Sequence, residues 1–549
     1  MKEKGDSIYT RKNCILSGIV SLLFTYSLFF GFLCHNDMYS FNVLYPFAWI
    51  AIWGISFFLI INSWNLIDKV KTNSEKKQEE IKKERKTVNS ILLFCLTFVI
   101  LFLAWLPCFI AAYPGFFTYD MGGEFVQIFY KEVPVNAVYP LVHSVLMWFC
   151  LKVGFRLFQD YNVGIAMFSI IHMLACAVSF AYETVFVYKI TRKISTAIIS
   201  IVYFSITPVI VIFSPCTNST VIGTALIVLL IIKYYEIFIQ EKYKNKIRWA
   251  FELCLFVFVA VLACNTRHSF AALIAIIILL QFFKKEKLLK RTIFLLCVLA
   301  LTFIFNAGIS KAFNAVKTES TEFISIPIQQ LASLYVKEGD SAFTADEKKV
   351  LLDYYADEHF KWFCPQNVDP IKIGMNKKLV ESEPGDFYRL WAKKGIQHPL
   401  AYLEAWNYFT YEAWYPFCVP DGYVKRNYVT SNSRTDYYNV SLDLPAQHEN
   451  RFPWLFEKIK WLSTQADVYK IPLLGWLSTI GYQYIFLVYV LGYKIFSKDK
   501  QMRFILFVSI LYYLVMLLAT IVVVRYYLLL FYSFPIVIGS MFCNTKSES

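Results

Sequence analysis

Asp120 is an acidic residue at a position where it could act as a general base. It closes the segment Tyr113-Pro114-Gly115-Phe116-Phe117-Thr118-Tyr119-Asp120, which directly follows a long apolar stretch of this 549-residue chain. Burial and neighbouring charges can tune the pKa of a carboxylate at the edge of a membrane, so that it takes a proton from a hydroxyl group. The alternative is that Asp120 caps a helix beginning at Met121. Glu124 lies one helical turn further on, and both acids are candidate catalytic residues.

Arg267 and Arg525 stand in short loops that otherwise contain almost no basic residues. Because membrane proteins keep Lys and Arg mainly in cytoplasmic loops, a cation in the opposite loops needs a reason. Binding a lipid phosphate through a bidentate guanidinium contact is one reason. A structural ion pair with a polar domain is another. For the first alternative we expect Tyr526, which follows Arg525, to contribute to the phosphate site.

Two histidines and two aromatic residues are further candidates for a binding site. His143 lies in an apolar stretch, where a lone histidine is more often structural, and His268 follows Arg267. Trp414 and Tyr415 could stack on a ligand, although they could equally be core residues. The chain contains no Walker motif, no HExxH and no GxGxxG after a strand, so we predict neither nucleotide-loop nor zinc-protease chemistry.

The composition places these residues in a membrane protein. Apolar residues make up 57% of the chain and charged residues only 17%, against roughly a quarter charged in soluble domains. The apolar residues come in runs of about 18 to 25, the length at which a helix crosses a bilayer. The net charge of +14 comes from short loops between these runs, which argues against a nucleic-acid partner.

The thirteen cysteines form no CxxC pair, and we predict no zinc or redox site. Cys364 and Cys418 lie in the one long hydrophilic stretch, where a disulfide and two free thiols both remain open. Asn218-Ser219-Thr220 and Asn439-Val440-Ser441 match the glycosylation sequon, which also occurs often by chance.

The fold class that follows is an all-α polytopic membrane protein with about twelve transmembrane helices. The lipid bilayer is therefore a predicted partner. The predicted spans are residues 13–34, 42–61, 89–113, 163–188, 196–213, 220–239, 249–264, 269–283, 292–310, 471–491, 504–523 and 526–542.

Basic residues alternate between the loops that join these spans. Because basic loops stay in the cytoplasm, we predict a multi-pass protein of the cell membrane with both termini cytoplasmic. Lys and Arg cluster in loops 2–12, 69–86, 189–193, 242–248, 284–291 and 494–503, whereas loops 35–41, 214–219 and 265–268 contain only Arg267.

The segment 139–158 is apolar enough to be a further span. If it crossed the bilayer, every later basic loop would face the outside, which the charge rule disfavours. We therefore predict that residues 113–160 form interfacial helices on the external surface. Phe125, Ile128 and Phe129 share one face of such a helix and Glu124 another, as in a helix that lies in the membrane plane.

Four regions follow from this division of the chain. Residues 1–88 hold two spans and a charged cytoplasmic linker, and residues 89–310 form the transmembrane core. Residues 311–470 are predicted to form a mostly helical extracytoplasmic domain, in which Thr344 and Glu347 are spaced as a capping box. Residues 471–549 contain the C-terminal spans.

Six short motifs extend from the third span to the C-terminus. They are YPGFFTYD (113–120) with Gln127, YPLVH (139–143), TRHSF (266–270), SIPIQQLASLYV (325–336), AWYPF (413–417) and VVRYYLLLFYSFP (523–535). In these motifs, and in the order of its parts, the chain resembles the GT-C superfamily of integral membrane glycosyltransferases. The resemblance is closest to an uncharacterised bacterial branch of that superfamily.

The resemblance implies a transferase that uses a polyprenyl-phosphate-linked sugar on the external face. A surface glycan, a glycolipid or a protein would be the acceptor. The product would belong to the cell wall or to a surface polysaccharide. Asp120 matches the position of the superfamily's catalytic acid, and Arg525 matches where such enzymes hold the donor phosphate. Gln127, Gln329 and Gln330 fall in the motifs and are expected to contact substrate, with His143, His268, Trp414 and Tyr415.

The chain departs from the branch in two places. Tyr139-Pro140 stands where the branch usually has His-Pro. The loop Ser214-Pro215-Cys216-Thr217-Asn218 lacks the second acid that recurs in GT-C enzymes. No cofactor and no metal ligand is therefore assigned, and a divalent ion, Mg²⁺ or Mn²⁺, stays an open alternative.

Two alternative functions belong to other classes. A transporter or flippase of lipid-linked saccharides predicts polar residues along a central path and often an internal repeat, and we detect no such repeat. A non-catalytic membrane assembly protein would keep the fold without activity, because fold alone does not imply function.

Overall fold

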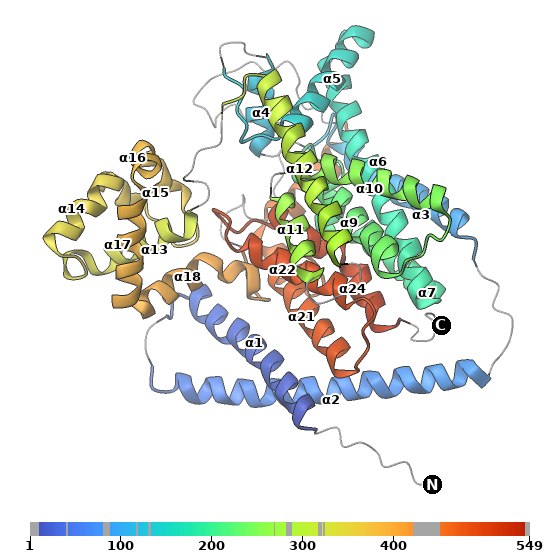
Figure 1. Cartoon of the computed structure of the whole chain (residues 1–549), viewed down its shortest axis with the longest axis horizontal. Helices are drawn as coiled ribbons and strands as arrows, with labels where there is room; N and C mark the ends of the chain where they lie inside the picture. The colour runs from blue at the N-terminus through green and yellow to red at the C-terminus, as the bar shows by residue number, and fades with distance from the viewer. Residues whose placement is uncertain are drawn as a thin grey trace.

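The computed structural model describes residues 10–39, 42–80, 88–116, 119–129, 133–267, 269–281, 288–316, 321, 324–420 and 451–543, without the side chains of residues 74–80, 119 and 120. Regular structure in these ranges is helical, and β-pairing there is limited to isolated bridges (Figure 1). The prediction of an all-α chain is confirmed for the described residues.

The first half of the chain contains twelve α-helices and one π-helix. They are α1 (Arg11–His35), α2 (Tyr45–Glu80), α3 (Ser90–Ala111), α4 (Tyr119–Phe129), α5 (Leu141–Phe158), α6 (Tyr161–Thr191), α7 (Ile194–Ile206), α8 (Pro208–Phe213), α9 (Ser219–Tyr234), the π-helix η1 (Tyr235–Ile239), α10 (Lys246–Thr266), α11 (Phe270–Gln281) and α12 (Leu288–Ala312).

The second half contains a group of shorter helices and then the C-terminal ones. They are α13 (Ser325–Glu338), α14 (Ala345–Tyr354), α15 (Asp369–Ile373), α16 (Lys377–Ser382), α17 (Pro384–Gln397), α18 (Pro399–Trp414), α19 (Pro453–Thr464), α20 (Leu474–Ser478), α21 (Ile480–Phe496), α22 (Arg503–Met516), α23 (Leu528–Tyr532) and α24 (Phe534–Met541), with 3₁₀ turns between some of them.

Nine helical segments of the described residues are long and apolar enough to cross a membrane. Eight coincide with predicted spans, and the ninth is α5, which we had predicted to lie on the surface. The other four predicted spans correspond to the shorter apolar helices α7, α11, α21 and α22, of 10 to 17 residues. The chain is a polytopic helical membrane protein.

Pro208 divides one predicted span in two. Residues 196–213 were expected to be continuous, but α7 ends at Ile206 and α8 begins at Pro208. Proline disfavours helical backbone in the residue before it, and Thr207 accordingly has an extended ψ of 121°. Proline itself is well tolerated as the first residue of a helix.

Segments with clustered Lys and Arg meet on one face, which we call the basic face. Lys71 lies 3.1 Å from Asp499, and Lys494 bonds the same carboxylate. Lys494 also donates to the carbonyl of Ser540 at 3.0 Å, near the C-terminus. Arg291 pairs with Glu241 at 3.0 Å. The alternation of loop charge thus corresponds to a grouping in space.

Helices α13 to α17 gather on the opposite side, which we call the domain face (Figure 1). They enclose a second hydrophobic core with Leu331, Tyr354 and Phe387 at its centre. The predicted capping box of Thr344 and Glu347 is present at the start of α14. Helix α18 leads from this core back to the membrane helices and packs against α1 and α21.

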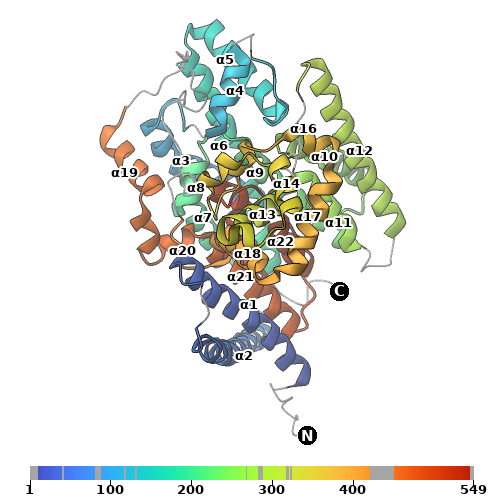
Figure 2. The same ribbon diagram turned by 90° about the vertical axis from the view of Figure 1, so that its left-hand side faces the viewer.

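Helix α5 extends past the end of α3. Helix α3 runs antiparallel to α6, since the amide of Val88 bonds Tyr188 near one end and Gly115 approaches Ser169 near the other. The segment 161–168 of α6 continues beyond that point, and α5 packs on it through a close backbone approach of Gly154 and Gly164. Figure 2 looks along α2 and shows α4 and α5 together at one rim of the molecule. This position fits a helix on the domain-face surface.

Candidate functional site

The segment that carries Asp120 is attached to the loop 214–218. The amide of Thr217 donates to the carbonyl of Phe116 at 3.0 Å, and the Thr217 hydroxyl contacts both that carbonyl and the sulfur of Met121. Gly115 makes the approach possible, because it has a φ of +149° and a Cβ there would lie 2.0 Å from Ser169 Oγ. Asp120 therefore lies beside this loop in the first turn of α4, although its side chain is outside the described part.

The same loop leads to Arg267. Asn218 caps α9 by accepting from the amide of Thr220 at 2.9 Å. Arg267 then donates to the Thr220 hydroxyl at 2.6 Å and to Ser269 Oγ at 2.9 Å. Both acceptors are neutral, and no carboxylate of the described residues pairs with Arg267. Asn218 is 1% exposed, so the first glycosylation sequon is inaccessible; Asn439 of the second lies outside the described residues, as does His268.

Arg267 and Arg525 lie at one aromatic ring. The guanidinium carbon of Arg267 is 4.1 Å from the ring centroid of Tyr526, and that of Arg525 is 5.2 Å from it. The structure thus brings together the three residues that the sequence suggested for a donor phosphate. A cation over an aromatic ring is held in place without being neutralised, so the contact with Tyr526 leaves the charge of Arg267 available for an anion.

Glu412 joins this group and was not singled out by the sequence. It is 3% exposed, and its carboxylate and Arg267 both act electrostatically on Tyr527. Glu412 was detectable in principle, because it is an isolated acid within the aromatic run of α18 that passes into the membrane helices. It supplies a buried carboxylate close to Tyr527, the residue after Tyr526, although the loop 214–218 has none.

Arg451 was also missed. Its guanidinium carbon lies 3.9 Å from the ring centroid of Tyr113, the residue that opens the Asp120 segment. It stands in a long hydrophilic stretch in which cations are ordinary, so no sequence signal marked it.

Glu124, His143 and His172 form a buried hydrogen-bonded chain. His143 Nδ1 lies 2.7 Å from Glu124 Oε2, and His143 Nε2 lies 3.2 Å from His172 Nε2. All three side chains are at most 2% exposed. Ser144 donates to the same Glu124 oxygen at 3.1 Å and receives a bond from Gln127 at 3.2 Å. The chain links α4, α5 and α6.

This network gives Glu124, His143 and Gln127 roles different from those expected. The carboxylate of Glu124 is occupied by His143 and Ser144, and His143 is enclosed rather than facing the interface. Gln127 accepts from the amide of Asn136 at 3.0 Å, which fixes the turn between α4 and α5. The three residues therefore hold α4 in place, and with α4 the backbone of Asp120.

A small cavity adjoins the network at Gln127 and Ser144. It measures about 290 Å³ and is lined by Gln127 and Ser144 and by apolar residues that include Leu141, Trp148 and Phe313. Its polar groups belong to the network, so a molecule that entered it would contact Ser144 and Gln127 rather than Glu124.

Gln329 and Gln330 are engaged inside the helical domain. Gln329 donates to the carbonyls of Cys364 and Pro365 at 2.7 and 3.0 Å. Gln330 accepts from Trp391 at 2.9 Å and donates to the carbonyl of Tyr402 at 3.2 Å. These bonds hold both glutamine side chains within the domain, which gives the SIPIQQ motif a structural role.

The loop that Gln329 holds touches the segment before Arg525. The amide of Val368 donates to the carbonyl of Thr520 at 3.3 Å, and Asn367 forms a β-bridge with Ile521. The SIPIQQ motif therefore connects the domain to the arginine group through backbone pairing.

Trp414 and Tyr415 are core residues. They are 5% and 6% exposed. The ring of Trp414 packs on Tyr26 at 5.3 Å, and Tyr415 packs on His35 at 5.6 Å. Of the two alternatives that the sequence left open, the structure supports packing of α18 against α1. Cys364 and Cys418 are free thiols.

Among the described residues, no group of three or more His, Cys, Asp and Glu side chains is arranged to hold a metal ion. The fold and the site define a helical, polytopic membrane protein with a cationic centre on its domain face. The chain belongs to a family of unknown function, DUF6020, which it matches over residues 131–549. No curated protein and no solved structure matches it.

Proposed function

We propose that the protein is a membrane glycosyltransferase that moves a sugar from a polyprenyl-phosphate-linked donor to a cell-surface acceptor on the extracytoplasmic face. The observation that carries the proposal is the placement of Arg267 and Arg525 at the ring of Tyr526, beside the loop that holds the Asp120 segment. A phosphate leaving group requires cations that stabilise it, and a hydroxyl nucleophile requires a base, so arginines and an acid from neighbouring loops suit this reaction.

In the proposed reaction the acceptor oxygen attacks the anomeric carbon. The bond between that carbon and the phosphate oxygen breaks, and the electron pair leaves with the polyprenyl phosphate. Arg267 and Arg525 stabilise the charge that develops on this phosphate. Asp120 takes the proton of the acceptor hydroxyl. Attack opposite to the leaving group inverts the configuration of the sugar.

Two features of the site support these roles of the arginines and of Asp120. The hydroxyls of Thr220 and Ser269 orient Arg267 without quenching its charge, so its remaining donors can meet a phosphate. The Glu124–His143–His172 chain fixes α4 to α5 and α6. Glu124 acts in this proposal as a positioning residue for Asp120.

Binding of the leaving group tests the proposal without knowledge of the sugar. Purified protein with Arg267→Gln or Arg525→Gln would be titrated with polyprenyl phosphate in detergent. Each loss of a charged contact is expected to weaken binding about tenfold or more. Lys311→Gln is the matched control, because Lys311 is exposed at the domain-face end of α12. Equal affinity of all variants would count against the phosphate site.

A further inference from the structure

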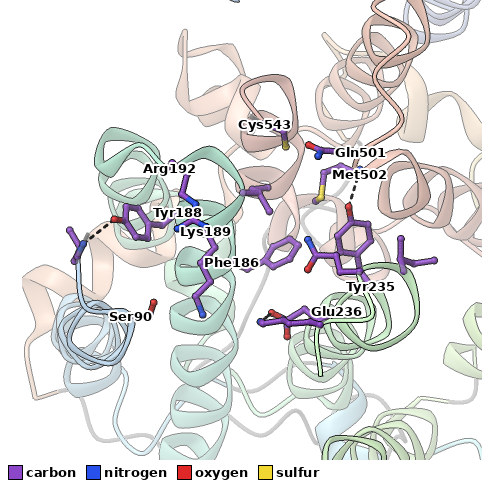
Figure 3. A pocket seen from close by; sticks show the side chains of 15 residues that line it. Ser90, Phe186, Tyr188, Lys189, Arg192, Tyr235, Glu236, Gln501, Met502 and Cys543 are labelled. Atoms are coloured by element: carbon purple, nitrogen blue, oxygen red, sulfur yellow. Dashed lines mark hydrogen bonds and ion pairs between the residues drawn. The ribbon is translucent and has the colours of Figure 1, made fainter. Parts of the chain in front are cut away.

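A second cavity, of about 780 Å³, opens on the basic face. It lies between the start of α3, the end of α6, the π-helix η1 and the segment 501–502. Figure 3 shows Tyr188, Lys189 and Arg192 of α6 on one side of this space and Tyr235 and Glu236 on the other. Its polar lining consists of Ser90, Lys189, Arg192, Gln240, Lys242 and Gln501, with Glu236 as the acid.

Other enclosed lysines of this face are neutralised by acids. Lys233 lies 2.7 Å from Glu252, and Lys494 bonds Asp499. Pairing of this kind is expected, because a buried charge without a partner is costly. The loop-charge rule explains why basic residues are present on this face. It does not explain why a half-buried one would lack an acidic partner.

Lys189 lacks such a neutralising partner. It is half-buried, and no carboxylate of the described residues lies within ion-pair distance of it. The charges that act on it are three cations, Lys242, Lys233 and Arg248, and one acid, Glu236. That acid is already bonded by Lys242, Tyr182 and Tyr243. The cavity therefore has an excess of positive charge around an unneutralised amine.

Arg192 adds a second cation at the same cavity. It ends α6 with a left-handed φ of 55°, and its side chain has no ion pair with any described residue. Arginine binds phosphate in a bidentate manner and lysine binds it as a point charge. The hydroxyl of Ser90 and the amides of Gln240 and Gln501 provide neutral donors in the same lining.

We propose that this cavity binds a phosphate-bearing anion, with Lys189 and Arg192 as its main ligands. The cavity is large enough to hold more than a phosphate group, and Val88, Phe186 and Ile239 offer apolar surface for the rest of the ligand. The phosphate belongs either to a membrane lipid at the basic-face interface or to a soluble phosphate compound. This site is independent of the proposed transferase site, since it lies on the opposite face.

The test uses the full-length protein and two probes. In one arm, protein in detergent is titrated with pyrophosphate. In the other, protein is reconstituted into nanodiscs of phosphatidylcholine with and without phosphatidylglycerol, and retained lipid is counted by native mass spectrometry. The variants are Lys189→Gln and Arg192→Gln. The control is Lys246→Gln, which removes the same charge from an exposed residue of this face outside the cavity.

Lys189→Gln and Arg192→Gln are each expected to weaken binding of one probe about tenfold, whereas Lys246→Gln stays within about twofold of the wild type. Loss in the pyrophosphate arm identifies a soluble ligand, and loss in the phosphatidylglycerol arm identifies a lipid. If both cavity variants bind both probes as the control does, the proposal is wrong. Arg192 is exposed, so its variant remains informative if Lys189→Gln fails to fold.

Discussion

Gly115 is the residue on which the position of the Asp120 segment depends most closely. Its φ of +149° is strained for any residue with a side chain, and its approach to Ser169 leaves no space for one. The sequence indicated only a loop at Tyr113-Pro114-Gly115. The partner of that turn, the loop 214–218, is about a hundred residues away in the chain, and a single sequence does not show which loop it meets.

Gly115→Ala is expected to destabilise the protein by about 2 to 3 kcal/mol, because it combines backbone strain with a steric clash. The measurement is the thermal midpoint of purified protein in detergent. Gly308→Ala is the matched control, since nothing lies within 4 Å of a Cβ at that position of α12. A midpoint for Gly115→Ala that equals that of the control would show that the loop adapts.

The pairing of Glu124 with His143 makes a second prediction for single residues. His143→Leu leaves a buried carboxylate without its partner and is expected to cost about 3 kcal/mol, whereas the double change with Glu124→Leu costs less than the sum of the two. Unfolding in mixed micelles with sodium dodecyl sulfate measures this coupling. Strictly additive effects would contradict a positioning role and leave Glu124 free for the chemistry.

Sequence reasoning found the residue types of this site but not their partners. Arg267 and Arg525 were marked by their rarity in their loops, and their common ring, Tyr526, follows Arg525 directly. His143 was weighed as structural, yet its link to Glu124 and His172 depends on how α4, α5 and α6 cross. Glu412 comes close to Tyr527 only because α18 returns from the domain into the membrane helices.

At the scale of elements, helix α5 could either cross the membrane or lie on its external surface. Its 18 residues are long and apolar enough to cross a membrane. Its packing on the segment 161–168, beyond the end of α3, favours a surface position instead. Apolar length alone could not decide this, whereas loop charge, a property of the whole chain, predicts a surface position.

Reporter fusions distinguish a membrane-spanning α5 from an α5 on the external surface. Alkaline phosphatase, which is active only outside the cytoplasm, would be fused after Ala137 and after Gln159, on either side of α5. We expect activity at both points, because a helix that lies on the external surface has both of its ends outside the cytoplasm. A fusion after Lys242, on the basic face, serves as the inactive control. Activity at only one of the first two points would mean that α5 spans the membrane.

The shorter helices mark where sequence-based prediction of spans was least accurate. Thr196 to Phe213 was predicted as one span, but Pro208 divides it into α7 and α8. Residues 471–491 were predicted as a span, whereas α21 begins only at Ile480. Hydropathy averages over such breaks, so it locates apolar segments better than it locates their ends.

At the scale of the whole molecule, charge is divided between two faces. The basic face gathers the Lys- and Arg-rich segments with Cys543, and the cavity around Lys189 lies there. The domain face holds α13 to α17, the arginines at Tyr526 and the Asp120 segment. This asymmetry suits an enzyme with its chemistry on one side better than a transporter with polar groups along a central path.

The surface glycans of cells with and without the gene provide the most direct test of the proposed transferase. Mass spectrometry of these glycans is expected to show one that loses a sugar substituent on deletion. Wild-type protein and Lys311→Gln should restore it, whereas Asp120→Asn and Arg525→Gln should not, at equal amounts in the membrane. An unchanged glycan profile on deletion, or full restoration by Asp120→Asn, would contradict a transferase with Asp120 as its base.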